Sequence, residues 1–272
     1  MPQNPETPSP EFIKKTQPDL REIYAKEKIE TVPYVTIWEG SKLEINCSFN
    51  AVDEQFRTAP EIEQIRPGLI EFQTKGKNYR DDPKSRLVGV HDENGKLNFT
   101  FQCVNYSDYI VTNMSMEVVF PGSNKTIREI LEPGPNLNSL AESKCSNHLG
   151  VSCLVITADN KLIMQRASSQ KVTGASQITS SASGAMDWKE PNINPFEVMQ
   201  SELFEELGLT NEETLYVEGI AIARELARGG KPEMFFILQT DLTSAEILSR
   251  VAQDPDKEVG SLFAIDLPQE SS

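Results

Sequence analysis

One helical segment constrains the fold of this chain more than any other feature of its sequence. The segment PFEVMQSELFEELG spans residues 195–208. Asn194 is a good N-cap for it, Pro195 suits its first turn, and Gly208 is the residue expected to end it. Its leucines gather on one side at helical spacing. Such a helix has to bury one apolar stripe, so the chain must supply a sheet or other helices to pack against it.

The opposite side of this helix carries three carboxylates. At about 100° per residue, Glu202, Glu205 and Glu206 fall within a sector of about 100°. Like charges at this spacing repel each other, and a bound cation would reverse the sign of that interaction. Oxygen ligands with no nearby Cys or His favour Mg²⁺, or Mn²⁺, over Zn²⁺. The alternative is an ordinary solvated acidic face, which is common on surface helices.

Strand patterns flank the helix in the second half of the chain. Residues 150–166 read as a strand, a turn at Asp159-Asn160 and a second strand. Strands are also predicted at 214–225, 233–242 and 262–267, with a helix at 244–253. Strands alternating with helices predict an α+β fold with a mixed sheet and flanking helices.

The first half contains shorter alternating runs. Strands are expected at 33–40, 42–49 and 69–74, and two apolar runs around Asn94-Gly95 predict a hairpin. The stretch 132–150 is rich in Pro, Gly and small polar residues, which is typical of a linker. These patterns predict a polar leader at 1–30, a smaller strand-rich α/β domain at 31–140 and a second domain at 141–268.

Composition excludes several kinds of function. The chain has 272 residues, 26 basic and 41 acidic, which gives a formal net charge of −15 and argues against binding nucleic acid or anionic lipid. The start lacks the apolar core of a signal peptide, and no run of about 18 apolar residues is present. Four scattered cysteines read as reduced thiols. A soluble, cytoplasmic protein is expected, either a monomer or a homodimer.

The order of residues from Gly184 to Leu209 resembles the Nudix box, G-x5-E-x7-R-E-U-x-E-E-x-G-U, in which U is a bulky aliphatic residue. Gly184 and Glu190 match its opening, and Glu202, Leu203, Glu205, Glu206, Gly208 and Leu209 match its second half. The resemblance implies a Nudix α/β/α sandwich.

Two features depart from this pattern. Ten residues separate Glu190 from the position before Glu202, where the box has seven, and Ser201 stands where the box has Arg. In the family that Arg pairs with the first Glu and steadies the loop. Catalytic competence is therefore a weaker implication of the resemblance than the fold.

The resemblance also implies a reaction, which is metal-assisted hydrolysis of a nucleoside diphosphate linked to another group. Glu202, Glu205 and Glu206 would hold Mg²⁺, which offsets phosphate charge and lowers the pKa of a bound water. A carboxylate from the helix or from a later loop would accept the proton of that water, and Glu258 is the candidate on the loop. For Glu258 the alternative is an exposed charge beside Lys257.

The chain as a whole resembles a eukaryotic Nudix branch that hydrolyses UDP-glucose and UDP-galactose and carries an N-terminal domain. The resemblance spans roughly residues 80–265 and implies cleavage of a UDP-sugar to UMP and a sugar 1-phosphate. The substrate-binding residues that it implies are Tyr106, Asn113, Arg166, Arg224 and Glu225. Inward packing of the aromatic turn and salt bridges of the arginines are the competing interpretations.

Two other functions stay open at the level of sequence. A Nudix hydrolase for ADP-ribose or a dinucleotide would carry the same box, because other loops select the substrate. A non-catalytic module that senses a nucleotide metabolite is favoured by Ser201 and the longer loop, and disfavoured by the intact acidic triplet.

Overall fold

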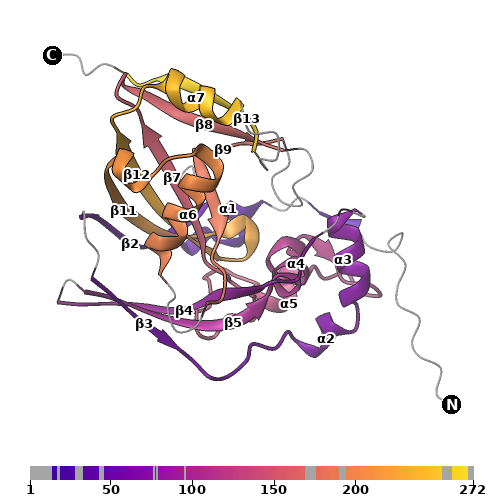
Figure 1. Ribbon diagram of the computed structural model, residues 1–272. Helices are drawn as coiled ribbons and strands as arrows, with labels where there is room; N and C mark the ends of the chain where they lie inside the picture. Colours follow the sequence, from indigo (N-terminus) through magenta and orange to yellow (C-terminus); the bar gives the residue numbers. More distant parts are fainter. Residues whose placement is uncertain are drawn as a thin grey trace.

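The chain folds as a mixed α+β structure with one large sheet and two small ones (Figure 1). The computed structural model describes residues 14–16, 19–27, 33–42, 46–75, 77, 79–94, 96–168, 176–189, 194–252 and 259–268. None of the helices in these ranges combines the length and hydrophobicity that a bilayer-spanning helix needs.

The large sheet has eight strands in the order β13-β8-β7-β12-β11-β2, with β10 beside β7 and β9 beside β8. Strands β7 and β12 run parallel, and the other neighbours in this sheet run antiparallel. The strands are β2 (Tyr34–Lys42), β7 (Gly150–Ile156), β8 (Lys161–Ala167), β9 (Ile178–Thr179), β10 (Ala182–Ala185), β11 (Thr214–Glu225), β12 (Lys231–Thr240) and β13 (Val259–Asp266).

The predicted acidic helix is confirmed as α6 (Pro195–Leu207). The side chain of Asn194 accepts a hydrogen bond from the amide of Phe196, and Gly208 ends the helix with a φ of 68°. Its leucines pack into a core together with the buried residues of β7 and β8. The stripe that the sequence required to be buried therefore lies against the large sheet.

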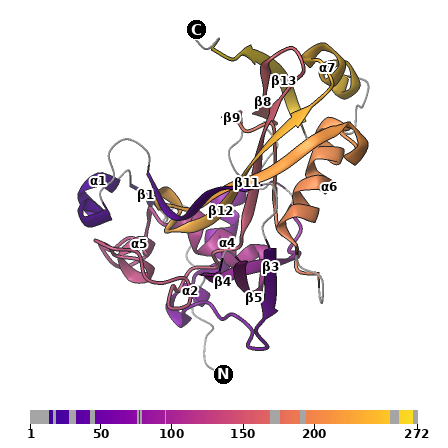
Figure 2. The same cartoon turned by 90° about the vertical axis from the view of Figure 1, so that its left-hand side faces the viewer.

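Helix α7 (Ser244–Ala252) packs on the same side of the sheet as α6, as Figure 2 shows. Ile247 of α7 joins the core that α6 covers. The α/β/α sandwich expected for this half is therefore corrected. Within the described part of the second half, both α-helices form a single layer on one face.

The three-stranded sheet has the order β3-β5-β4, formed by β3 (Asn46–Ala51), β4 (Pro83–Glu93) and β5 (Lys96–Asn105). Strands β4 and β5 form the predicted hairpin, and Asn94 has a φ of 55° at its turn. Strand β3 pairs with β5 in parallel.

Short helices complete the first half. They are α1 (Leu20–Ile23), η2 (Ala25–Glu27), α2 (Pro60–Glu63), α3 (Arg66–Thr74), α4 (Tyr106–Val111), η3 (Asn113–Ser115) and α5 (Ile127–Leu131). The other short elements are the strand pair β1 (Lys14–Lys15) and β6 (Val118–Val119), and the helices η4 (Asn211–Glu213) and η5 (Leu226–Arg228).

The prediction of a strand at 69–74 is wrong, because these residues form most of α3. A proline lies in the first turn of the helix, where its fixed φ is compatible with helical backbone. Leu69 is fully buried in a second core with Ile62 and Ile127. The alternating apolar pattern was short enough for this packing to override it.

The predicted linker at 132–150 is exposed at most positions from 133 to 144 but buried from 145 to 150, and it is hydrogen-bonded to the first half. The guanidinium of Arg86 donates to the carbonyls of Leu140 at 2.9 Å and Ser143 at 2.8 Å. Ser146 and Asn147 have no exposed surface. Polar residues were taken as a sign of solvation, but Asn147 is hydrogen-bonded in the interior, where its side chain donates to the Ser143 hydroxyl at 2.8 Å.

The two halves share both a sheet and a core. Strand β2 comes from the first half and forms the edge of the large sheet beside β11. Leu87, Phe99 and Phe101 of the small sheet belong to the same core as Val151 and Leu203 of the second half. The large sheet and the core therefore both contain residues from each side of the predicted boundary near residue 140.

Candidate functional site

Two of the three predicted carboxylates of α6 face strand β10. Glu206 is buried, and its Oε2 accepts a hydrogen bond from the amide of Ser183 at 2.9 Å. Glu202 lies so close to Gly184 that a Cβ placed on this glycine would be 1.9 Å from the Glu202 Oε1. The glycine at this position therefore lets the helix carboxylate approach the strand.

The third carboxylate, Glu205, is on the exposed side of the helix. Its Oε1 accepts a hydrogen bond from the Ser201 hydroxyl at 2.9 Å. Over the described ranges, no three His, Cys, Asp or Glu side chains converge so that they could hold an ion. The expectation that Glu202, Glu205 and Glu206 together hold a metal ion stays a prediction.

The remaining pair still suits magnesium. Mg²⁺ is usually held by one or two protein carboxylates, with water and substrate phosphates completing its shell. Glu202 and Glu206 are oxygen donors that contact adjacent residues of β10. The donor set therefore fits a magnesium ion that is shared with a phosphorylated ligand.

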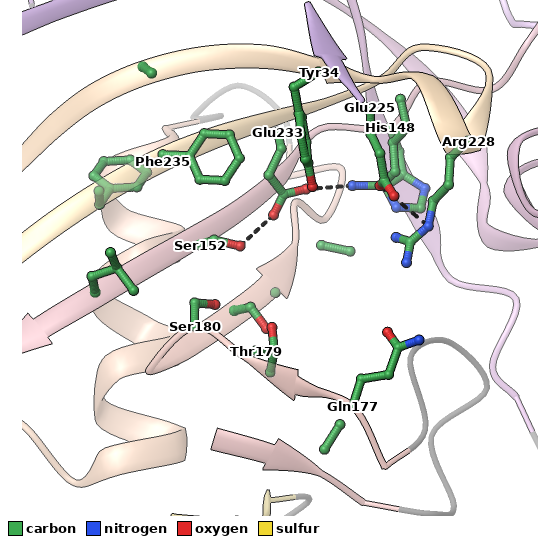
Figure 3. A pocket seen from close by; sticks show the side chains of 18 of the residues that line it. Tyr34, His148, Ser152, Gln177, Thr179, Ser180, Glu225, Arg228, Glu233 and Phe235 are labelled. Carbon is green, nitrogen blue, oxygen red and sulfur yellow. Dashed lines mark hydrogen bonds and ion pairs between the residues drawn. The ribbon is translucent and has the colours of Figure 1, made fainter. Parts of the chain in front are cut away.

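Strand β10 also lines a pocket of about 670 Å³, which is shown in Figure 3. Ser183 and Gly184, the two residues that contact Glu206 and Glu202, both line it. The volume is in the usual range for small-molecule sites. Glu202 and Glu206 thus contact two residues that line the pocket.

Aromatic rings line part of the pocket, and we call Tyr34, Tyr106, Tyr109, His148 and Phe235 the aromatic wall. The rings of Tyr34 and Phe235 meet edge to face with centroids 5.9 Å apart, and those of Tyr109 and His148 are 4.4 Å apart. Burial, together with nearby cations such as Lys231, holds the pKa of His148 well below its usual value. The imidazole is therefore neutral at pH 7.

Two ion pairs lie beside the aromatic wall. Glu225 approaches Arg228 at 3.4 Å, and Glu233 accepts hydrogen bonds from Lys231 at 2.7 Å and Ser152 at 2.6 Å. Both cations are thus matched by a carboxylate. A metal ion at β10 would add positive charge that favours an anionic diphosphate in the pocket.

A different chemistry lines another side of the pocket. Gln177, Thr179 and Ser180, which we call the polar wall, come from the segment around β9. In Figure 3 they lie across the pocket from Ser152 and Glu233. Amide and hydroxyl groups share this side with Ile178, whereas the aromatic wall has rings with charged groups beside them.

Of the five predicted substrate-binding residues, Tyr106 and Glu225 line the pocket. Asn113 does not line it, because its buried amide donates to the Asn147 side chain at 2.8 Å and to the Arg228 carbonyl at 2.7 Å. Asn113 thus fixes the backbone that carries Arg228, which corrects its predicted contact with substrate.

The two arginines that were predicted to bind phosphate, Arg224 and Arg166, also do not line the pocket. The guanidinium of Arg224 is buried and donates to the carbonyls of Gly230 at 2.9 Å and Asn138 at 2.6 Å. Arg166 is exposed and donates to the Ser176 carbonyl at 3.1 Å. Both guanidinium groups therefore brace loops. Glu190 and Glu258 lie outside the described residues.

Sequence reasoning missed Tyr34, His148, Arg228, Lys231 and Glu233. The pair Arg228 and Lys231 could have been noticed, because two cations flank Gly229-Gly230 in the turn between two predicted strands. Tyr34 and His148 carried no such signal, since they reach the pocket from strand β2 and from the buried loop.

No protein-family model matches the sequence, and no curated protein matches it. Among solved structures, the chain is similar to DR0079 from Deinococcus radiodurans, with a TM-score of 0.34 and 15% identity over 44% of this chain and 67% of that one. It is also similar to a bifunctional NMN adenylyltransferase/ADP ribose pyrophosphatase from Francisella tularensis, with a TM-score of 0.31 and 18% identity over 45% of this chain. The match spans 34% of the Francisella chain. Likenesses this weak assign neither family nor activity.

Proposed function

We propose that this protein is a magnesium-dependent hydrolase of the Nudix type, which cleaves a nucleoside diphosphate linked to another group. The proposed substrate is a UDP-sugar, cleaved to UMP and a sugar 1-phosphate. One observation carries the proposal, which is that Glu202 and Glu206 contact Gly184 and Ser183 of a strand that lines a ligand-sized pocket.

The residues of the pocket suit the parts of such a substrate. The aromatic wall offers rings for the base, since flat rings prefer offset or edge-on contact with other rings. Arg228 and Lys231 can donate to phosphate oxygens in place of the glutamates that they now contact. Both functions lie within one continuous pocket.

In the proposed reaction, water attacks one phosphorus and the anhydride P–O bond breaks. Glu202 and Glu206 would hold Mg²⁺, which would offset phosphate charge and lower the pKa of water. A helix carboxylate or Glu258 is proposed to accept the proton of the attacking water. The terminal phosphate of the departing sugar 1-phosphate takes the electrons of the broken bond.

A substrate panel tests the proposal. UDP-glucose, ADP-ribose and NADH are incubated with Mg²⁺ or with EDTA, and the products are separated by chromatography. We expect metal-dependent cleavage that is strongest for UDP-glucose, and a loss of at least about 100-fold in Glu206→Gln. Glu197→Gln is the matched control, because Glu197 is exposed in the first turn of the same helix. Cleavage that persists in EDTA, or that survives Glu206→Gln, contradicts the mechanism.

A second candidate function is a nucleotide-metabolite sensor without turnover. It is favoured by the outward position of Glu205 and by Ser201, which replaces the arginine of the box and hydrogen-bonds to that carboxylate. Calorimetric binding of a panel member without any product supports the sensor. Preferential cleavage of ADP-ribose or NADH would instead support the dinucleotide or ADP-ribose hydrolase.

A further inference from the structure

The polar wall is held in place by its backbone rather than by its side chains. The amide of Ala167 donates to the carbonyl of Gln177 at 2.9 Å, and the Ser176 amide donates to the carbonyl of Ala167 at 3.2 Å. Thr179 is in register with Gln165 of β8. The segment is therefore anchored to strand β8 of the large sheet while its side chains face the pocket (Figure 3).

Its polar groups retain much of their hydrogen-bonding capacity. The Ser180 hydroxyl donates to the Ala182 carbonyl at 3.1 Å, which leaves its oxygen able to accept. The Gln177 amide and the Thr179 hydroxyl make no side-chain hydrogen bond to any described residue. Together they offer both donors and acceptors toward the pocket.

We infer that the polar wall binds the hydroxyl groups of the substituent on the far phosphate, and that this substituent is a polyol such as a sugar. A sugar hydroxyl donates and accepts at once, which matches amide and hydroxyl partners better than aromatic rings do. The rings and cations lie elsewhere in the pocket, so a flat second heterocycle would find no stacking partner among the three residues of the polar wall. This inference rests on the proposed function and assigns residues to its selectivity.

The inference predicts how selectivity is distributed. A site built to hydrogen-bond hydroxyl groups discriminates against ligands that lack them, because its polar groups are then left unpaired. Removing those groups should therefore abolish the additional affinity that the sugar gives to the ligand. The affinity for the nucleotide part should stay unchanged.

Binding calorimetry in EDTA tests this prediction with UDP and UDP-glucose as the two probes. We expect the wild type to bind UDP-glucose roughly tenfold more tightly than UDP, since two hydrogen bonds of ordinary strength give about that ratio. The double variant Gln177→Leu, Thr179→Val should bind both probes with the affinity of UDP. Ser176→Ala is the matched control, because this exposed serine is next to the wall and outside the lining.

The outcomes separate the inference from the proposed function. Equal affinity for UDP and UDP-glucose in the wild type overturns the inference and leaves hydrolysis of another diphosphate possible. A double variant that loses UDP as well as UDP-glucose shows a structural role and also overturns it. Failure of UDP itself to bind, together with the absence of cleavage across the panel, overturns the proposed function.

Discussion

At the scale of single residues, the missing side chain of Gly184 has the most specific consequence. A Cβ there would overlap the Glu202 carboxylate, so Gly184→Ala must displace either the strand or the helix side chain. We expect kcat to fall at least tenfold with the fold retained. A rise of about 1.4 kcal/mol in the activation free energy, caused by a misplaced carboxylate, already lowers the rate by that factor. Steady-state kinetics and circular dichroism check both parts.

Gly89→Ala is the control for this substitution. A Cβ on Gly89 would be 3.3 Å from the far end of the exposed His91 side chain, which can move away. If Gly184→Ala and Gly89→Ala have the same activity, the contact between Gly184 and Glu202 has no functional weight.

His148 gives a pH dependence whose sign is fixed by its burial. Its pKa in the folded protein is well below the value of about 6.5 that it has in the unfolded chain. Below pH 6.5 the unfolded chain therefore binds a proton that the folded chain does not, so stability falls as the pH falls. The slope that this single proton can contribute is at most about 1.4 kcal/mol per pH unit, reached only below pH 6.5.

Urea unfolding between pH 7.5 and 5 measures this contribution. His148→Gln should show a shallower loss of stability than the wild type over this range, because the titrating ring has been removed. His91→Gln, which changes an exposed histidine, should follow the wild-type slope. Parallel slopes for His148→Gln and wild type would rule out a buried neutral imidazole as the cause.

At the scale of elements, helix α6 shows what local sequence can predict. The cap, the proline and the terminal glycine each act only on the end of the helix where they lie, and all three predictions are confirmed. The segment 69–74 shows the limit, because its helix is stabilised by contacts with Ile62 and Ile127 rather than by local pattern. The candidate site lies between these cases. The carboxylates were visible on the helix, but their orientation toward β10 depends on the packing of helix on strand.

The cap of α6 can be tested directly. Asn194→Ala removes the acceptor of the Phe196 amide and should lower the free energy of unfolding by about 1 kcal/mol. Asn194→Asp keeps an acceptor and should stay close to the wild type. Thermal and chemical denaturation measure both variants, and an unchanged stability of Asn194→Ala would show that the cap contributes nothing.

At the scale of the whole molecule, the shared core makes the two halves interdependent. Fragment 141–268 would lose β2 and the apolar residues Leu87, Phe99 and Phe101, which leaves the edge of β11 unpaired. We expect this fragment to lack a cooperative unfolding transition, whereas the full chain shows one. Calorimetry compares them, and a cooperative transition of the fragment would show that the second half folds alone.

The linker-like composition at 132–150 predicted a domain boundary, so nothing in the sequence indicated that the two halves share a sheet and a core. Strand pairing between residues far apart leaves no local trace, and polar residues such as Ser146 and Asn147 are as common in loops as in buried networks. The predicted domain boundary followed composition, while the structure follows the pairing of β2 with β11.

The pairing of β2 with β11 also dictates when this molecule can become complete during its own synthesis. Tyr34 leaves the ribosome 191 residues (225 − 34) before its partner Glu225. At ordinary elongation rates the early strand waits about 10 to 40 s for its neighbour. Until then the backbone of β2 has no β11 to pair with, and Tyr34 does not yet line the pocket. The ligand site can consequently assemble only after Glu225 has been synthesised.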